Sequence, residues 1–230
     1  MDKNNGYFSK TRTYSIITFG DSTTALRGGF ISKVYNERLE DNLLKKGLNV
    51  HVSNAGVCGN TTADAKQRYY NDIIKYNPDM VIIQFGINDS IIPESGGKPR
   101  LSILLYEKNL RFFVLDLLQN NKKCILMTPN LLRWSNEAKK IYGYPPYNIS
   151  DPEGFNLYLK NYVNIVRKLA LDKSIPLVDV YKKFEEYDKI ETQSVNDDLL
   201  LDGIHPNDKG HSIIADMLTD MIVAMINLND

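Results

Sequence analysis

Short apolar runs alternate with longer amphipathic segments along this chain. The runs are rich in β-branched and aromatic residues, which is typical of strands, and Gly20 stops the first one. The run at 80–85 is apolar on both faces, as in a central strand of a parallel sheet. The predicted strands span residues 14–19, 50–52, 80–85, 123–127 and 177–180.

The segments between these runs have helical apolar spacing. In the first, Val34, Leu39 and Leu43 are separated by charged residues, and Gly47 provides a C-terminal cap. The second helix is interrupted by Asn77-Pro78-Asp79 before the third strand. The predicted helices span residues 34–46, 62–76, 102–119, 155–171 and 208–226.

This alternation predicts an α/β fold with a doubly wound, flavodoxin-like parallel sheet of five strands in the order 2-1-3-4-5. With 230 residues and 43% hydrophobic content, the chain can bury one substantial core, and one domain over residues 1–230 is expected. The longest irregular stretch, 129–154, is long enough to suggest a functional or disordered loop.

Charge and composition exclude several classes of partner. The 28 basic and 28 acidic residues balance, and no basic stripe is present, so nucleic acid is not an expected partner. No apolar run could span a bilayer, and residues 1–6 lead into no signal-peptide core, so a cytoplasmic location is expected unless a signal was removed. Cys58 and Cys124 are too few for a disulfide framework and are expected to be free thiols.

Four short segments lie where a predicted strand ends or in the loop before the last helix. They are residues 20–22, 54–61, 86–89 and 202–206. A parallel sheet brings the carboxyl ends of its strands to one edge, where ligands bind. Each segment alone resembles an ordinary turn or cap, but their joint occurrence in this order predicts a serine esterase site.

Ser22 is the candidate nucleophile, because it follows the first strand on a turn after Gly20. A serine hydroxyl needs a base to remove its proton. Two of the three histidines, His51 and His211, fall within a predicted strand and helix, which leaves His205 in a loop. Asp202, three residues earlier, can fold back onto one ring nitrogen while the other nitrogen faces the serine.

Three neutral donors are candidates for an oxyanion hole. They are the backbone N–H groups of Ser22 and Gly59 and the side-chain amide of Asn88. Donors held at an oxyanion typically contribute about 2.7 to 4 kcal/mol each. Gly59 allows close approach because it has no side chain, and Gly86 allows the tight turn that aims Asn88 into the cleft.

Other polar residues near these segments have simpler predicted roles. Asp21 and Asp89 are expected to cap backbone N–H groups, although a carboxyl group beside the nucleophile could also titrate with it. Cys58 could be a reactive thiol but is expected to be a small buried residue behind the oxyanion loop. His211 is expected on a helix face.

No cofactor or metal ion is expected. His205, Asp202 and Asp208 could conceivably hold a metal ion, but their spacing matches no recognised zinc site.

The four segments resemble the blocks of the SGNH hydrolase branch of the GDSL esterase and lipase superfamily. The family blocks map onto Ser22, Gly59, Asn88 and His205, with Asp202 as the third member of the triad. The resemblance implies a three-layer α/β/α fold and metal-independent hydrolysis through an acyl-serine intermediate, with Gly59 and Asn88 completing the oxyanion hole. The sequence from Ser22 to Ala25 is also similar to the start of some carbohydrate acetylesterases.

The loop at 129–154 bears on the substrate. Its aromatic and proline residues could stack on a sugar ring or simply pack the loop onto the domain. They are Trp134, Tyr142, Tyr144, Pro145, Pro146 and Tyr147. No long apolar lid helix is evident, which favours a soluble ester such as an acetylated sugar. Arg100 and Arg133 could recognise an acidic substrate, although isolated arginines near loops are usually solvated.

The favoured function is a serine esterase that hydrolyses short-chain esters through an acyl-Ser22 intermediate, with acetyl esters, such as O-acetyl groups on carbohydrates, as the expected substrates. A lysophospholipase-like enzyme or an acyltransferase could use the same triad. A catalytically silent binding module would not need the whole set of residues. A nucleotide binder is disfavoured, because residues 20–24 lack the glycines and lysine of a phosphate loop.

Overall fold

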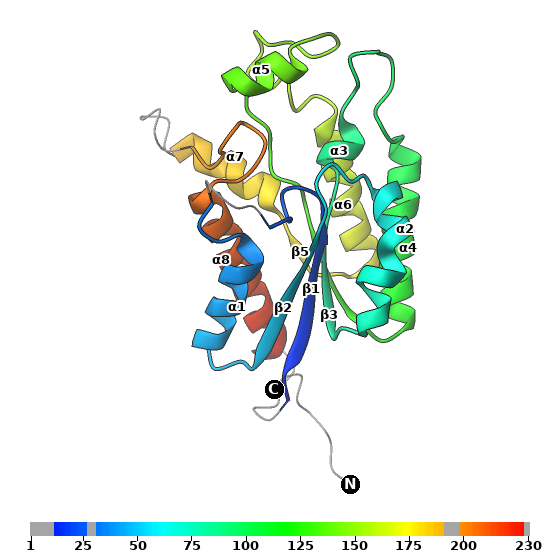
Figure 1. Cartoon of the computed structure of the whole chain (residues 1–230), viewed down its shortest axis with the longest axis vertical. Helices are drawn as coiled ribbons and strands as arrows, with labels where there is room; N and C mark the ends of the chain where they lie inside the picture. Colours follow the sequence, from blue (N-terminus) through cyan, green and yellow to red (C-terminus); the bar gives the residue numbers. More distant parts are fainter. Residues whose placement is uncertain (1–11, 27–30, 191–197, 228–230) are drawn as a thin grey trace.

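A five-stranded parallel sheet lies between two layers of helices in the computed structural model, which describes residues 12–26, 31–190 and 198–227 (Figure 1). The strand order is β2-β1-β3-β4-β5, which confirms the predicted topology. The strands are β1 (Tyr14–Gly20), β2 (Val50–Gly56), β3 (Met80–Gln84), β4 (Lys123–Met127) and β5 (Leu177–Val178).

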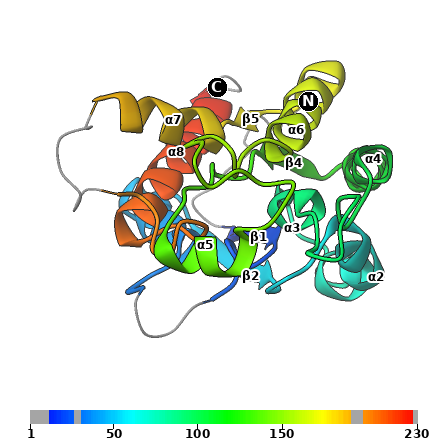
Figure 2. The ribbon, with the colours of Figure 1, turned by 90° about the horizontal axis from the view of Figure 1, so that it is seen from above.

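Helices α1 and α8 cover one face of the sheet, whereas α2, α4 and α6 cover the other (Figure 1). Figure 2 shows α3 and α5 over the carboxyl ends of the strands. The α-helices are α1 (Tyr35–Lys45), α2 (Thr62–Asp72), α3 (Ile87–Ser90), α4 (Ile103–Gln119), α5 (Asn136–Tyr142), α6 (Leu159–Lys173), α7 (Val180–Ile190) and α8 (Asp208–Asn227), and a 3-10 turn, η1 (Ile74–Tyr76), follows α2.

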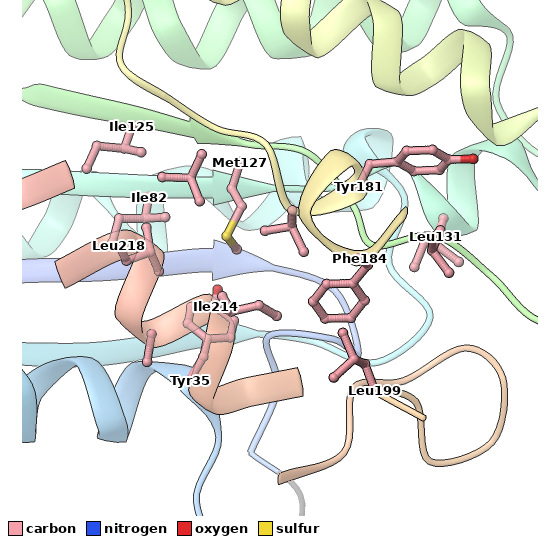
Figure 3. Close-up of a cluster of buried hydrophobic side chains, with 14 of the residues drawn as sticks. Tyr35, Ile82, Ile125, Met127, Leu131, Tyr181, Phe184, Leu199, Ile214 and Leu218 are labelled. Carbon is pink, nitrogen blue, oxygen red and sulfur yellow. The ribbon is translucent and has the colours of Figure 1, made fainter. Parts of the chain in front are cut away.

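Strand β3 shows how this sequence builds two cores. Met80 and Ile82 pack into the cluster on the α1 and α8 side, whereas Val81 and Ile83 pack into the cluster on the opposite side. Figure 3 shows the first cluster. All four side chains are buried, and full burial of an aliphatic side chain stabilises the fold by about 1.5–3 kcal/mol. The doubly apolar strand therefore lies at the centre of the sheet, as predicted.

The fifth strand is shorter than predicted, because the chain turns into α7 at Val180. Three buried residues of α7 have helical spacing, namely Val180, Tyr181 and Phe184. The chain therefore packs on the core as a helix from Val180, where the prediction had the end of a strand. Helix α7 was not predicted. Helix α5, which Ser135 caps by accepting a hydrogen bond from the N–H of Ala138, was not predicted either and occupies part of the 129–154 stretch.

The sheet register brings the predicted site segments together. Gly20 at the end of β1 lies opposite Gly56 of β2 and Gln84 of β3. The segments that follow these three positions therefore leave the sheet side by side at its carboxyl edge.

Candidate active site

Ser22, His205 and Asp202 form one chain of hydrogen bonds. The Oγ atom of Ser22 lies 2.9 Å from Nε2 of His205, and Nδ1 of the same ring lies 2.6 Å from Oδ2 of Asp202. Ser22 is partly exposed on the turn after β1, and His205 is in the loop before α8. In this arrangement one ring nitrogen can accept the serine proton while the carboxylate stabilises the resulting imidazolium.

The second carboxylate oxygen of Asp202 binds its own loop. Oδ1 accepts hydrogen bonds from the backbone N–H groups of Ile204 at 3.0 Å and His205 at 2.8 Å. Burial alone would raise the pKa of Asp202, but the hydrogen bonds from the ring and backbone of His205 outweigh it and lower the pKa to about 2. Asp202 is thus a carboxylate at neutral pH, which is the state that supports a cationic histidine.

The segment after β4 holds the loop of Asp202 and His205. The side-chain amide of Asn130 donates to the carbonyl oxygen of Ile204 at 2.8 Å, and the backbone N–H of Arg133 donates to that of Gly203 at 2.8 Å. The hydroxyl of Ser135 donates to the carbonyl oxygen of Asp202 at 2.6 Å. Three successive carbonyl groups are therefore fixed from one segment. Sequence reasoning did not identify Asn130 or Ser135.

The turn that carries Ser22 is closed by Asp21. Oδ1 of Asp21 accepts hydrogen bonds from the backbone N–H and the hydroxyl of Thr23, both at 2.9 Å. Burial raises the pKa of Asp21, whereas these bonds from Thr23 and a smaller contribution from Asn88 oppose the rise. Asp21 therefore has the capping role expected from the sequence.

Asn88 lies in α3, directly after the end of β3, and its side chain has two different ends. Oδ1 accepts a hydrogen bond from Arg100 at 3.2 Å. Nδ2 is buried and makes no hydrogen bond of ordinary geometry within the described part of the chain, although it lies close enough to the carboxyl group of Asp21 to help lower the pKa of that group. A buried donor that is only loosely engaged within the protein suits a group that binds an oxyanion during reaction. Gly86, at φ 139°, makes the turn that precedes Asn88.

Gly59 has a left-handed backbone conformation, with φ 77°. Apart from its two chain neighbours, no described residue places a heavy atom within 4 Å of the position that a Cβ atom would occupy there. The glycine is thus needed for the backbone conformation, and its open side leaves room for a substrate. The roles of Ser22, Gly59 and Asn88 as oxyanion donors remain predictions.

Asp89, next to Asn88, is buried and holds the start of α2. Its Oδ1 accepts hydrogen bonds from the N–H of Thr62 at 2.8 Å and from its hydroxyl at 2.7 Å. Burial raises the pKa of Asp89 to about 7, against the effect of these hydrogen bonds. Asp89 therefore caps a helix, as expected.

The prediction for Cys58 was wrong. Its side chain is exposed beside Gly59 rather than buried behind it, because the left-handed turn faces solvent. Cys124 is buried, which raises the pKa of its thiol to about 12, and both thiols are free as predicted.

The conceivable metal site is not assembled. Asp208 binds Ser32 and Arg38 instead of joining His205. Within the described residues, no three potential metal ligands of the His, Cys, Asp or Glu type lie together.

His211 lies on the buried face of α8. Its Nδ1 accepts a hydrogen bond from the backbone N–H of Tyr35 at 3.2 Å. It is a helix-face residue, as expected, and it joins α8 to α1.

The aromatic residues of the 129–154 stretch pack on one another and on residues outside the stretch. Trp134 stacks on Phe155 with ring centroids 4.4 Å apart. Tyr147 is buried, and its hydroxyl accepts a hydrogen bond from the N–H of Ile92 at 2.9 Å. Of the two interpretations of these residues, packing of the loop accounts for both contacts. Arg133, which could have recognised an acidic substrate, forms ion pairs with Glu153 and Asp188 within the chain.

Comparison with known proteins decides the family. The profile of the GDSL-like Lipase/Acylhydrolase family matches residues 18–213. The chain belongs to this family. This GDSL-family protein is therefore a carboxylic ester hydrolase, and its sheet order and helical layers are those of SGNH-type hydrolases.

Two relatives illustrate the range of the family. The GDSL-family chain is 30% identical over 214 residues to the uncharacterized lipoprotein YqeF of Bacillus subtilis (strain 168), covering 89% of the chain and 88% of YqeF. It is 31% identical over 172 residues to an acetylxylan esterase of Geobacillus stearothermophilus, covering 73% of the chain and 70% of that enzyme. Because one relative is a lipoprotein, the cytoplasmic location remains a prediction.

Solved structures extend the comparison. The acetyl xylan esterase AlAXEase matches with a TM-score of 0.72 and 27% identity, over 90% of this chain and 99% of that one. A catalytic mutant of Axe2, an acetylxylan esterase from Geobacillus stearothermophilus, matches with a TM-score of 0.70 and 26% identity, over 91% and 94%. Across the residues described, no helix has the length and apolar character needed to cross a membrane.

Proposed function

We propose that this enzyme hydrolyses short-chain esters, chiefly acetyl esters on carbohydrates, through an acyl-Ser22 intermediate. The observation that carries the proposal is the hydrogen-bonded chain from Ser22 through His205 to Asp202. The acetyl group and the carbohydrate are supported by the relatives named acetylxylan esterases.

In the proposed acylation step, Oγ of Ser22 attacks the carbonyl carbon of the ester and Nε2 of His205 takes the hydroxyl proton. The negative charge that develops on the carbonyl oxygen is stabilised by the N–H groups of Ser22 and Gly59 and by Nδ2 of Asn88. Collapse of the tetrahedral intermediate breaks the ester bond, and His205 returns the proton to the departing alkoxide.

Deacylation repeats the sequence with water. His205 removes a proton from the attacking water molecule, and collapse of the second tetrahedral intermediate breaks the bond to Oγ of Ser22. His205 then returns the proton to Oγ, which releases the acid and regenerates Ser22. Asp202 remains ionised throughout, because its pKa is about 2.

The test is hydrolysis of p-nitrophenyl esters from acetyl to dodecanoyl by the wild type, Ser22→Ala and Ser95→Ala. Ser95 is exposed in the loop between α3 and α4, so its substitution is the matched control. We expect activity on short chains that is lost in Ser22→Ala alone. Full activity of a folded Ser22→Ala variant would contradict the proposal.

A second assay measures acetate release from acetylated xylo-oligosaccharides and tests the carbohydrate part of the proposal. A preference for long acyl chains in the first assay would instead indicate a lysophospholipase-like substrate. A rate that depends on an added alcohol acceptor would indicate acyl transfer by the same triad.

A further inference from the structure

Arg100 joins the two segments that carry Gly59 and Asn88, two of the three proposed oxyanion donors. Its Nη1 donates to Oδ1 of Asn88 at 3.2 Å, and its Nη2 donates to the carbonyl oxygen of Gly59 at 3.1 Å. Gly59 follows β2 and Asn88 follows β3, strands that are not neighbours in the sheet. Strand β1, which is followed by the turn that carries Ser22, lies between β2 and β3. One guanidinium group thus links the segments that lie on either side of the Ser22 turn.

The position of Arg100 is fixed by its own backbone. Its N–H donates to the carbonyl oxygen of Ile91 at 2.8 Å, and the N–H of Leu101 donates to that of Asp89 at 3.1 Å. The loop between α3 and α4 therefore returns to the segment that holds Asn88. The side chain of Arg100 is solvent-exposed, so it reaches the two acceptors from the rim of the site.

The contact with Asn88 determines which end of its amide faces the reaction. Because Oδ1 is occupied by Arg100, the amide cannot rotate by half a turn without losing a charge-assisted hydrogen bond. Nδ2 then stays on the opposite side, where it is buried, makes no hydrogen bond of ordinary geometry among the described residues and lies near Asp21. A flipped amide would present an oxygen atom to the oxyanion and repel it.

We propose that Arg100 is a positioning residue that orients Asn88 and ties it to the Gly59 turn. The inference rests on the proposed function, because it assigns Asn88 and Gly59 to the oxyanion hole. The planar fork of the guanidinium group presents two separate nitrogen atoms, one to each acceptor, which the single ammonium nitrogen of a lysine does not reproduce. Arg100 acts through Asn88 and Gly59 without touching the reacting atoms.

The experiment compares kcat and KM for p-nitrophenyl acetate in the wild type, Arg100→Ala, Arg100→Lys and Arg111→Ala. Arg111 is the matched control, because it makes ion pairs with Glu107 and Asp172 on the helical face of the protein. Removal of a whole oxyanion donor lowers kcat by about 10²–10³, and loss of its orientation should lower kcat by about tenfold. We expect this loss in both Arg100 variants, with KM changed less than about twofold.

A double-mutant cycle separates orientation from a general effect of charge. In an Asn88→Ala background, Arg100→Ala should lower kcat by less than about threefold, because its main target is gone. An equal loss in both backgrounds would overturn the inference. So would full activity of Arg100→Lys, which would show that charge suffices, or a rise in KM alone, which would place Arg100 on the substrate.

The Ser22→Ala variant, measured in parallel, keeps this inference distinct from the proposed function. If Ser22→Ala retains activity, the proposed function fails before the Arg100 data are considered. If Ser22→Ala is inactive and Arg100→Ala equals the wild type, only the role of Arg100 is overturned. Thermal melting of each variant checks that it is folded, and Arg100→Lys provides a second variant at the same position.

Discussion

The guanidinium group of Arg68 donates from Nη2 to the carbonyl oxygen of Gly20 across 2.9 Å. From Nη1 it also donates to the carbonyl oxygen of Ala55 at 2.9 Å, and it lies over the ring of Phe19. Arg68 belongs to α2, so one side chain fixes the carboxyl ends of both β1 and β2 to a helix. The turn of Ser22 begins directly beyond that attachment.

Replacement of Arg68 by alanine should lower the free energy of unfolding by about 2–3 kcal/mol, because two backbone carbonyl groups lose a charged donor. Urea denaturation measures the change. Arg111→Ala is the control, and its surface ion pairs should contribute less than about 1 kcal/mol. Equal destabilisation by the two substitutions would contradict this role of Arg68.

Replacement of Asn130 by alanine should lower kcat by about tenfold, because the carbonyl group of Ile204 loses its donor and the His205 loop loses part of its support. KM should change little, since Asn130 is buried below the site. Steady-state kinetics on p-nitrophenyl acetate measure the effect. Thr219→Ala, which removes a buried hydroxyl group within α8, should leave kcat unchanged. A normal kcat in Asn130→Ala would show that the contacts from Arg133 and Ser135 suffice.

Asp89 should make the stability of the protein depend on pH. Its pKa is raised from 3.8 to about 7 in the folded state. The folded state therefore keeps a proton that the unfolded state loses, and the stabilisation from that proton is complete below about pH 4 and disappears as the pH rises to about 7. The total effect is at most about 4 kcal/mol.

The measurement is the unfolding free energy of the wild type and Asp89→Asn from pH 4 to pH 8. The variant cannot titrate at this position, so its stability relative to the wild type should increase between pH 4 and pH 7 and level off above. The change of this stability difference with pH is the diagnostic quantity. Its absolute value is not, because the amide group of the new asparagine also needs a hydrogen-bond acceptor, which changes the stability at every pH. A difference that does not vary with pH would contradict the raised pKa.

The sheet was predictable because its strands are short apolar runs separated by amphipathic helices. Residues 80–83 alternate between two cores, so all four are apolar, and a continuous apolar run is easily recognised in the sequence. Helix α7 was missed because Val180, its first residue, continues the apolar run of β5 in the sequence and was therefore assigned to the strand. Helix α5 has only seven residues, too few for a periodic pattern to be distinctive.

The candidate site was partly predictable for a similar reason. Ser22, Asn88 and His205 lie at element ends that a parallel sheet brings together, so topology alone places them near one another. Arg68, Arg100 and Asn130 could not be found in that way. One partner of each lies 41 to 74 residues away in the sequence, and each of these contacts depends on the reach of one side chain.

Asp202 and His205 are three residues apart in one loop, whereas 183 residues separate His205 from Ser22. The proposed acid and base can thus stay paired in a fragment, but the proposed nucleophile, Ser22, meets them only when β1 and α8 belong to the same folded body. If Ser22 is the nucleophile, esterase activity requires the segment after β1 to be packed beside the loop before α8. If the chain is cut in a surface loop between Ser22 and His205, each fragment alone should lack esterase activity. Mixing the two fragments should restore activity only if they fold together.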